Sequence, residues 1–123
     1  MAADVNATGL DHWTPLHFAA NEGKQDVLDY LLERPDIEVE VSSAIGRTPL
    51  HLAAIRGYSQ IARTLIYNFS NKNAKDLEEN TPLHYASEFG HHEVIILLIK
   101  EAFADPMSKN KLGQGPSDIS QNL

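Results

Sequence analysis

The chain has 123 residues, the size of one domain, and its 42% apolar and 22% charged residues are those of a folded protein, which excludes global disorder. Seventeen acidic residues against ten basic ones give a formal net charge of -7, so neither a basic nucleic-acid-binding face nor affinity for an anionic membrane is expected. The chain has no cysteine, which excludes disulfides, thiol nucleophiles and cysteine-ligated zinc.

The start of the chain shows no secretory signal, because a basic start followed by an apolar run is missing. The longest apolar stretch, residues 94–99, is far too short to span a bilayer. We therefore expect a cytoplasmic or nuclear protein that has no membrane association.

One four-residue segment, Thr-Pro-Leu-His, occurs three times along the chain. It begins at Thr14, Thr48 and Thr81, so the spacings are 34 and 33 residues. A pair of small residues follows each copy, and a glycine comes three residues after that pair. An apolar run ends each unit, over residues 27–32, 61–66 and 94–99. A period of this length indicates a repeat protein.

Each copy predicts two helices. The threonine hydroxyl can accept from free amides of the first turn, and proline suits the first helical position, where no amide donor is needed. The small pair allows close approach to neighbouring helices, and the glycines (Gly23, Gly57 and Gly90) allow the left-handed residue that ends the first helix. The apolar run forms the second helix. Polar segments such as 71–80 then form projecting hairpins or loops.

These residues resemble the ankyrin repeat family, most closely over residues 80–99. Residues 3–7 resemble the tail of a preceding repeat, and residues 113–119 resemble the opening of a fourth. The resemblance implies an all-α fold, an ankyrin-repeat solenoid of paired antiparallel helices with projecting hairpin loops. It comprises about three full repeats plus degenerate terminal half-repeats. A single domain, residues 1–123, is then divided into a leading hairpin (1–13), three repeats (14–47, 48–80 and 81–114) and a degenerate partial repeat (115–123).

Some positions depart from the family pattern. Phe69 and Phe103 stand where each second helix of the family is followed by glycine. His12 and Glu79 stand where a hairpin glycine is expected, and only Gly46 keeps it, so we expect those two hairpins to be less regular. The decayed last segment favours a minimal natural array over a fragment cut from a longer one.

The histidines do not predict a metal centre. His17, His51 and His84 belong to the repeat itself, and the resemblance implies that their rings bond backbone around the hairpins and hold neighbouring repeats together. His91 and His92 are adjacent on a helix, so their side chains point about 100° apart and chelate poorly. No nucleophile elbow, phosphate loop or His-Glu-x-x-His helix is present. We therefore expect no catalytic residue, no metal and no cofactor.

Positions at which the repeats differ are the candidates for binding a partner. The resemblance places them on hairpin tips and on the first helices, which together form a concave face. Aromatic and arginine side chains at such positions are typical of interfaces. The predicted partner-binding residues are Trp13, Asn21, Glu22, Arg47, Ile55, Arg56, Asn80, Tyr85, Glu88 and Phe89. An alternative, favoured for Phe18, Leu52 and Tyr85, is that they pack beneath the hairpins.

The sequence therefore predicts a monomeric protein–protein interaction module that is not an enzyme and that binds another protein, not nucleic acid, through the concave face. The alternative is a structural or assembly scaffold, as a segment of a longer repeat protein or of a polypeptide whose catalytic domain lies elsewhere.

Overall fold

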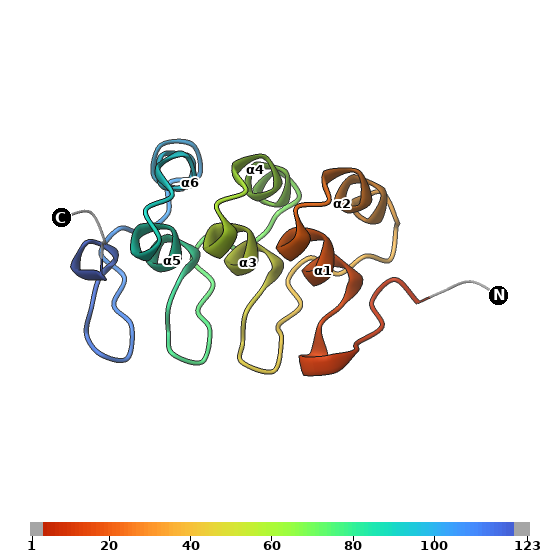
Figure 1. Cartoon of the computed structure of the whole chain (residues 1–123), viewed down its shortest axis with the longest axis horizontal. Helices are drawn as coiled ribbons and strands as arrows, with labels where there is room; N and C mark the ends of the chain where they lie inside the picture. Colours follow the sequence, from red (N-terminus) through yellow and green to blue (C-terminus); the bar gives the residue numbers. More distant parts are fainter. Residues whose placement is uncertain (1–3, 120–123) are drawn as a thin grey trace.

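The helices stand in two parallel rows, with hairpins projecting from one of them (Figure 1). In this computed structural model, residues 4–119 are described. Residues 1–3 and 120–123, which belong to the predicted terminal partial repeats, lie outside them. One row contains α1 (Pro15–Glu22), α3 (Pro49–Arg56) and α5 (Pro82–Glu88), and the other contains α2 (Gln25–Leu32), α4 (Ser59–Tyr67) and α6 (His92–Ile96). Residues 4–119 contain no strand. The predicted all-α solenoid of about three repeats is confirmed.

Three short elements complete the chain. A 3-10 turn, η1 (Leu10–His12), lies in the first hairpin, and a π-helical turn, η2 (Leu97–Glu101), continues α6. A 3-10 helix, η3 (Pro116–Ile119), packs against α5 at the place where a further first helix would stand. Within residues 4–119, the fourth unit consists of a hairpin and this short helix.

Each first helix begins with the same reciprocal cap. The amide of His51 donates to the hydroxyl oxygen of Thr48 at 3.3 Å, and the amide of Thr48 donates to the ring nitrogen Nδ1 of His51 at 3.0 Å. The same pair of bonds caps α1 at Thr14 and α5 at Thr81. Two backbone donors that lack a partner within the helix are thereby satisfied at each start, which explains why the Thr-x-x-His spacing recurs.

Two of the second helices, α4 and α6 with η2, are followed by a left-handed residue that is not glycine, whereas α2 is followed by Glu33 with φ -80°. Phe69 has φ 71°, and the next amide, that of Ser70, donates to the carbonyl of Leu65 at 3.0 Å. Phe103 has φ 57°, and the next amide donates across a longer loop, to the carbonyl of Leu98 at 2.8 Å. The predicted third repeat (81–114) is one residue longer than the second (48–80). The π turn η2 accommodates this additional residue, so the two repeats still pack in line.

The hairpin at Glu79 is as regular as the one that keeps glycine, so the expected irregularity is wrong there. Gly46 donates to the carbonyl of Ser43 at 2.9 Å, and Glu79 makes the equivalent bond to Asp76 at 2.8 Å, with φ values of 81° and 62°. The Asp76 carboxylate also accepts the amides two and four residues ahead, at 3.0 and 2.9 Å. These bonds hold Glu79 in a conformation that otherwise favours glycine.

The first hairpin is less regular, as expected. His12 has φ 59° and donates to the carbonyl of Gly9 at 3.0 Å, like its counterparts, but Asp11 before it is also left-handed, with φ 57°. Gly9 stands at the position of Asp76 in the third hairpin, but it has no side chain that could accept the backbone amides ahead of it. This turn is closed instead by η1, in which the amide of Trp13 donates to the carbonyl of Leu10 at 3.1 Å.

The core lies between the two rows of helices. The leucines of the repeated segment, Leu16, Leu50 and Leu83, are at most 2% exposed, and the small pairs beside them are buried as well. Residues of α2, α4 and α6 close the core from the other side, including Leu28, Leu65 and Val94. Each unit covers its apolar surface with that of its neighbour, so the stack is stabilised mainly between adjacent units.

Candidate protein-binding surface

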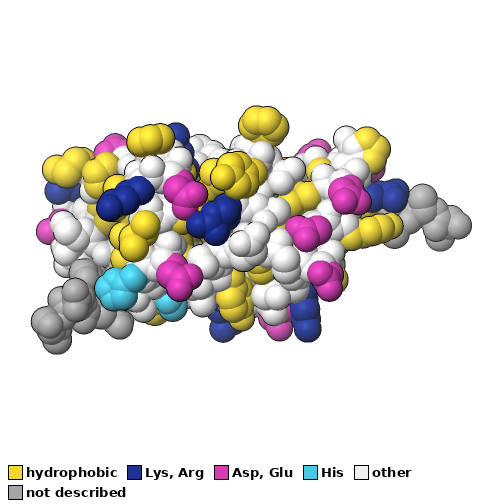
Figure 2. Space-filling view, turned by 90° about the horizontal axis from the view of Figure 1, so that it is seen from above, with side chains coloured by type: hydrophobic (Ala, Val, Ile, Leu, Met, Phe, Trp, Pro, Cys, Tyr) yellow, Lys and Arg dark blue, Asp and Glu magenta, His cyan; other side chains and the backbone are white. Residues whose placement is uncertain are grey.

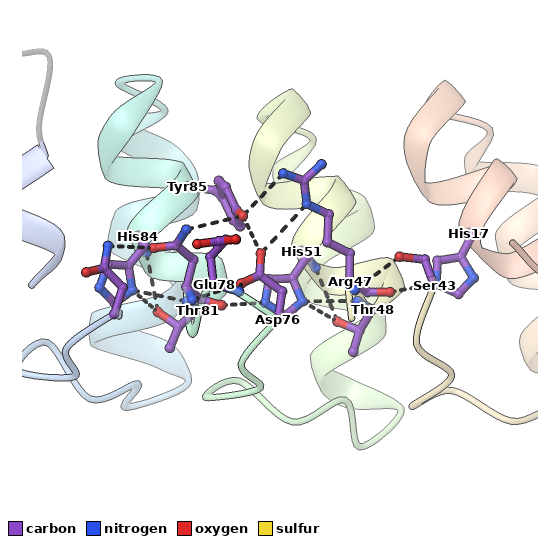
Figure 3. Close-up of polar contacts among 12 residues, drawn as sticks. His17, Ser43, Arg47, Thr48, His51, Asp76, Glu78, Thr81, His84 and Tyr85 are labelled. Carbon is purple, nitrogen blue, oxygen red and sulfur yellow. Dashed lines mark hydrogen bonds and ion pairs between the residues drawn. The ribbon is translucent and has the colours of Figure 1, made fainter. Parts of the chain in front are cut away.

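Each repeat histidine joins two neighbouring units, where a unit is a hairpin together with the two helices that follow it. Because Nδ1 accepts from the threonine amide, the proton lies on Nε2, which donates to a backbone carbonyl of the next hairpin. The acceptors for His17, His51 and His84 are the carbonyls of Arg47, Asn80 and Gln114, each at 2.9 Å. Figure 3 shows these contacts side by side. The rings therefore do what the resemblance implied, and they fix the hairpins on which candidate binding residues stand.

Burial lowers the pKa of His17 and of His51, because removal from water disfavours the charged imidazolium, while the hydrogen bond to the next hairpin opposes this effect. The unfolded chain, whose histidines have the ordinary pKa of 6.5, then binds protons that the folded chain does not. The stability contributed by the neutral rings is therefore fully present above pH 6.5 and is lost as the pH falls towards the folded pKa values.

We accordingly expect the urea midpoint of unfolding to be lower at about pH 5.5 than at about pH 7.5, because the slope of stability with pH follows the difference in bound protons. Circular dichroism at the two pH values measures it. The variant His12→Ala/His92→Ala is the control: both side chains are exposed, so the pH dependence should persist in it. Equal midpoints for the unmodified chain at both pH values would contradict the role given to the buried rings.

A buried polar cluster holds Arg47 in place (Figure 3). Its guanidinium lies 4.9 Å from the centre of the Tyr85 ring and donates to the Tyr85 hydroxyl at 3.2 Å. That hydroxyl donates to the carboxylate of Asp76, whose side chain is only 2% exposed and lies 3.7 Å from Arg47 Nε. Burial, together with the bond to Asp76, raises the pKa of Tyr85, so the phenol stays protonated.

Two of the predicted contact residues, Tyr85 and Asn80, belong to this cluster. Tyr85 is 5% exposed, which corrects its place among the partner-binding residues: it packs beneath the hairpin and positions Arg47. Asn80 is half-buried; its amide donates to the Tyr85 hydroxyl at 3.4 Å, and its oxygen accepts from Asn110 at 2.9 Å. The sequence could not indicate the bonds from Arg47 to Tyr85 and from Asn110 to Asn80, because each joins residues of different units.

Aromatic side chains remain exposed at both ends of the concave face, which here denotes the hairpin tips together with α1, α3 and α5. Phe18 is 48% exposed, so the expectation that it packs beneath a hairpin is wrong, whereas Leu52 is buried as expected. The half-buried Trp13 meets Phe18 edge to face, with ring centres 4.9 Å apart. Phe89, at the end of α5, is 42% exposed.

Three of the remaining predicted residues form one polar link across two units. Arg56 Nε donates to the side-chain oxygen of Asn21 at 3.1 Å, and Asn21 donates to the carboxylate of Glu22 at 3.0 Å. Ile55 is half-buried and packs against the buried residues of α1 to α4 on one side and of α5 and α6 on the other. Glu88 lies near the end of α5 and makes no side-chain hydrogen bond to these residues within the described part of the chain. The structure thus spreads the predicted residues over three units and does not bring them together in a single pocket.

The hairpin tips add apolar residues that the predicted set omits. Backbone bonds join successive tips, from Ala44 to Asp11 at 2.8 Å, from Leu77 to Ile45 at 3.0 Å and from Lys111 to Glu78 at 3.0 Å. One large apolar side chain is exposed at each tip: Leu10, Ile45, Leu77 and Leu112. The available signal was one large aliphatic residue in each of these turn segments. A recess of about 240 Å³, lined partly by Trp13 and Ile45, lies between the first two tips.

The opposite side of the molecule, seen in Figure 2 from α2, α4 and α6, carries hydrophobic side chains scattered among acidic and basic ones. Tyr67, Phe69 and Phe103 are its most exposed aromatic residues. Over residues 4–119, no three histidine or carboxylate side chains are placed so as to hold a metal ion. In that same part of the chain, no helix has the length and apolar character needed to cross a membrane.

Comparisons with known proteins agree with this architecture. The family model described as ankyrin repeats (3 copies) matches residues 1–76 and 38–110. The chain is 32% identical over 119 residues to the tyrosine-protein kinase Shark of Drosophila melanogaster, which covers 96% of this chain and 12% of the kinase. It is 37% identical over 97 residues to the probable E3 ubiquitin-protein ligase XBOS31 of Oryza sativa subsp. japonica, covering 78% and 22%. It is also 36% identical over 75 residues to protein phosphatase 1 regulatory subunit 12A of Mus musculus, covering 61% and 7%. The chain thus spans less than a quarter of each of these relatives.

Proposed function

Because the chain belongs to the ankyrin-repeat family, whose repeats are general protein-interaction modules, we propose that it binds a protein partner through the concave face. The observation that carries this proposal is the exposure of Phe18 and Phe89 on the units that flank the held Arg47. Aromatic and arginine side chains are the residues on which interfaces most often depend.

The rigidity of these side chains supports the choice of face. Trp13 stacks on the buried ring of His17, with centres 6.0 Å apart, and Phe18 rests against Trp13. Phe69, on the opposite side, is 90% exposed and has no ring partner among the described residues. Side chains already held in one conformation lose less entropy on binding, so the concave face is the more favourable contact surface.

The test compares two double variants that each remove two exposed aromatic rings. Phe18→Ala/Phe89→Ala alters the concave face, and Tyr67→Ala/Phe103→Ala alters the opposite side. A partner captured by the unmodified chain from a lysate, identified by mass spectrometry and then purified, is titrated against all three proteins by calorimetry. We expect the concave variant to bind at least about tenfold more weakly and the control variant to bind normally.

Matching thermal unfolding curves for the two variants exclude loss of fold as the cause. Normal binding by Phe18→Ala/Phe89→Ala, with weakened binding by Tyr67→Ala/Phe103→Ala, overturns the choice of face and moves the contact to the side formed by α2, α4 and α6.

The share of each relative that the chain covers supports a second proposal, in which it is a scaffold segment of a longer polypeptide. The relatives include a kinase and a regulatory subunit, in which the matching stretch is a small part of the length. Mass spectrometry of the native protein tests this: a mass well above 13.6 kDa supports it, and a mass of that size opposes it.

A further inference from the structure

The charges on the concave face alternate from unit to unit. Asp11 and Glu22 lie in the first hairpin and at the end of α1. In the third unit, Glu78 holds the place of Asp11, and Glu88, the last residue of α5, lies one position before the place of Glu22. Three of them are exposed and Glu88 is half-exposed. Within residues 4–119, none of the four forms an ion pair. The first and third units therefore present unneutralised carboxylates, and the tip of the fourth hairpin, beside Glu78, carries the exposed Lys111.

The middle unit carries the opposite charge. Arg56 is exposed at the end of α3, and across residues 4–119 its guanidinium forms no ion pair, only the bond from Nε to Asn21. The two terminal nitrogens of the guanidinium, which can clasp a carboxylate side by side, stay uncommitted by the bonds of this region. Arg47 lies in the hairpin of the same unit, but its charge is largely matched by Asp76.

The geometry points to the kind of partner that fits, and the inference rests on the proposed use of the concave face. We propose that the partner is an extended polypeptide segment with an acidic side chain at Arg56 and a basic side chain on either side of it, at the first and third units. Adjacent packed helices lie about 8–10 Å apart, and an extended chain advances about 3.3 Å per residue. The basic residues therefore stand about three positions before and after the acidic one.

The opposite order of charges in the segment is disfavoured by the same side chains. A basic residue at the centre meets Arg56, and acidic residues at the flanks meet Glu22 and Glu88, so like charges face each other at three places. The net charge of -7 adds a preference for a segment that is basic overall, which the flanking residues supply.

The test uses a phage-displayed library of random peptides selected on the whole chain. Selected peptides should carry Asp or Glu with Lys or Arg about three positions away on both sides. A synthetic peptide from this set should bind Arg56→Glu about tenfold more weakly than the unmodified chain, because attraction is replaced by repulsion. Exchanging its central acid for lysine should restore binding to Arg56→Glu.

Two further variants separate this inference from the proposed function. Lys100→Glu makes the same change in net charge away from the concave face and should leave binding unchanged. Peptides that lose binding to Phe18→Ala/Phe89→Ala but bind Arg56→Glu normally overturn the charge order while leaving the concave face in place. Peptides that bind Phe18→Ala/Phe89→Ala normally overturn the concave face itself. Selection of no peptide beyond those retained by an unrelated protein also overturns the inference, because segments with this charge order are present in the library.

Discussion

Replacing His51 by alanine is expected to lower the free energy of unfolding by about 4 kcal/mol, a large part of the total for a domain of this size. His51 is fully buried and bonds both the amide of Thr48 and the carbonyl of Asn80. Its removal leaves these two buried groups without partners, at about 1–3 kcal/mol each, and opens a cavity besides. Urea denaturation followed by circular dichroism measures the change.

The matched control is His92→Ala, which removes an exposed histidine at the start of α6 and is expected to change stability by less than about 0.5 kcal/mol. If both substitutions cost the same, the bond between hairpins contributes nothing beyond the loss of a side chain, and the account of how neighbouring units are joined is wrong.

Gly57→Ala is expected to destabilise the chain by about 2–4 kcal/mol. Gly57 has φ 78°, which costs an alanine about 1–2 kcal/mol. A Cβ placed there lies 2.5 Å from Nδ1 of His91, whose ring is held by the bond from Nε2 to the carbonyl of Ile55 at 2.9 Å. The ring can move away only by giving up that bond, so a steric cost adds to the backbone cost.

Gly90→Ala isolates the backbone contribution. Gly90 likewise follows the first helix of its unit, α5, and is left-handed, with φ 69°. No atom lies within 4 Å of the place that a Cβ would occupy there. The substitution Gly90→Ala should therefore lower the free energy of unfolding by only about 1–2 kcal/mol. The double variant Gly57→Ala/His91→Ala should recover part of the loss seen in Gly57→Ala. Equal effects at the two glycines, with no recovery in the double variant, would contradict the close packing of His91 on Gly57.

The local structure could be predicted from the sequence because its causes are local. The Thr-Pro-Leu-His segment contains both partners of the cap, the residue that starts the helix and the leucine that is buried, so no distant residue is needed to interpret it. The turn at Glu79 was predicted wrongly although its cause is just as local. Position 79 alone suggests strain, and only the carboxylate of Asp76 three residues earlier explains how it is held.

The candidate site was harder to predict than the fold, because exposure depends on which neighbour covers a residue. Phe18 and Tyr85 hold equivalent positions in α1 and α5, yet the first is half-exposed and the second is buried. The difference arises from Arg47, which lies over the Tyr85 ring, whereas Phe18 meets only the edge of Trp13. A single sequence contains no signal that pairs residue 47 with residue 85.

The bonds made by the repeat histidines have a consequence for how such a surface can change over generations. Each ring donates to a main-chain carbonyl oxygen. The residues that supply these oxygens have unrelated side chains: Arg47, Asn80 and Gln114. The hydrogen bond between neighbouring units therefore does not depend on which side chain the accepting residue carries. Mutation can rewrite the side chains that a partner meets, one hairpin at a time, while the frame that presents them is inherited intact.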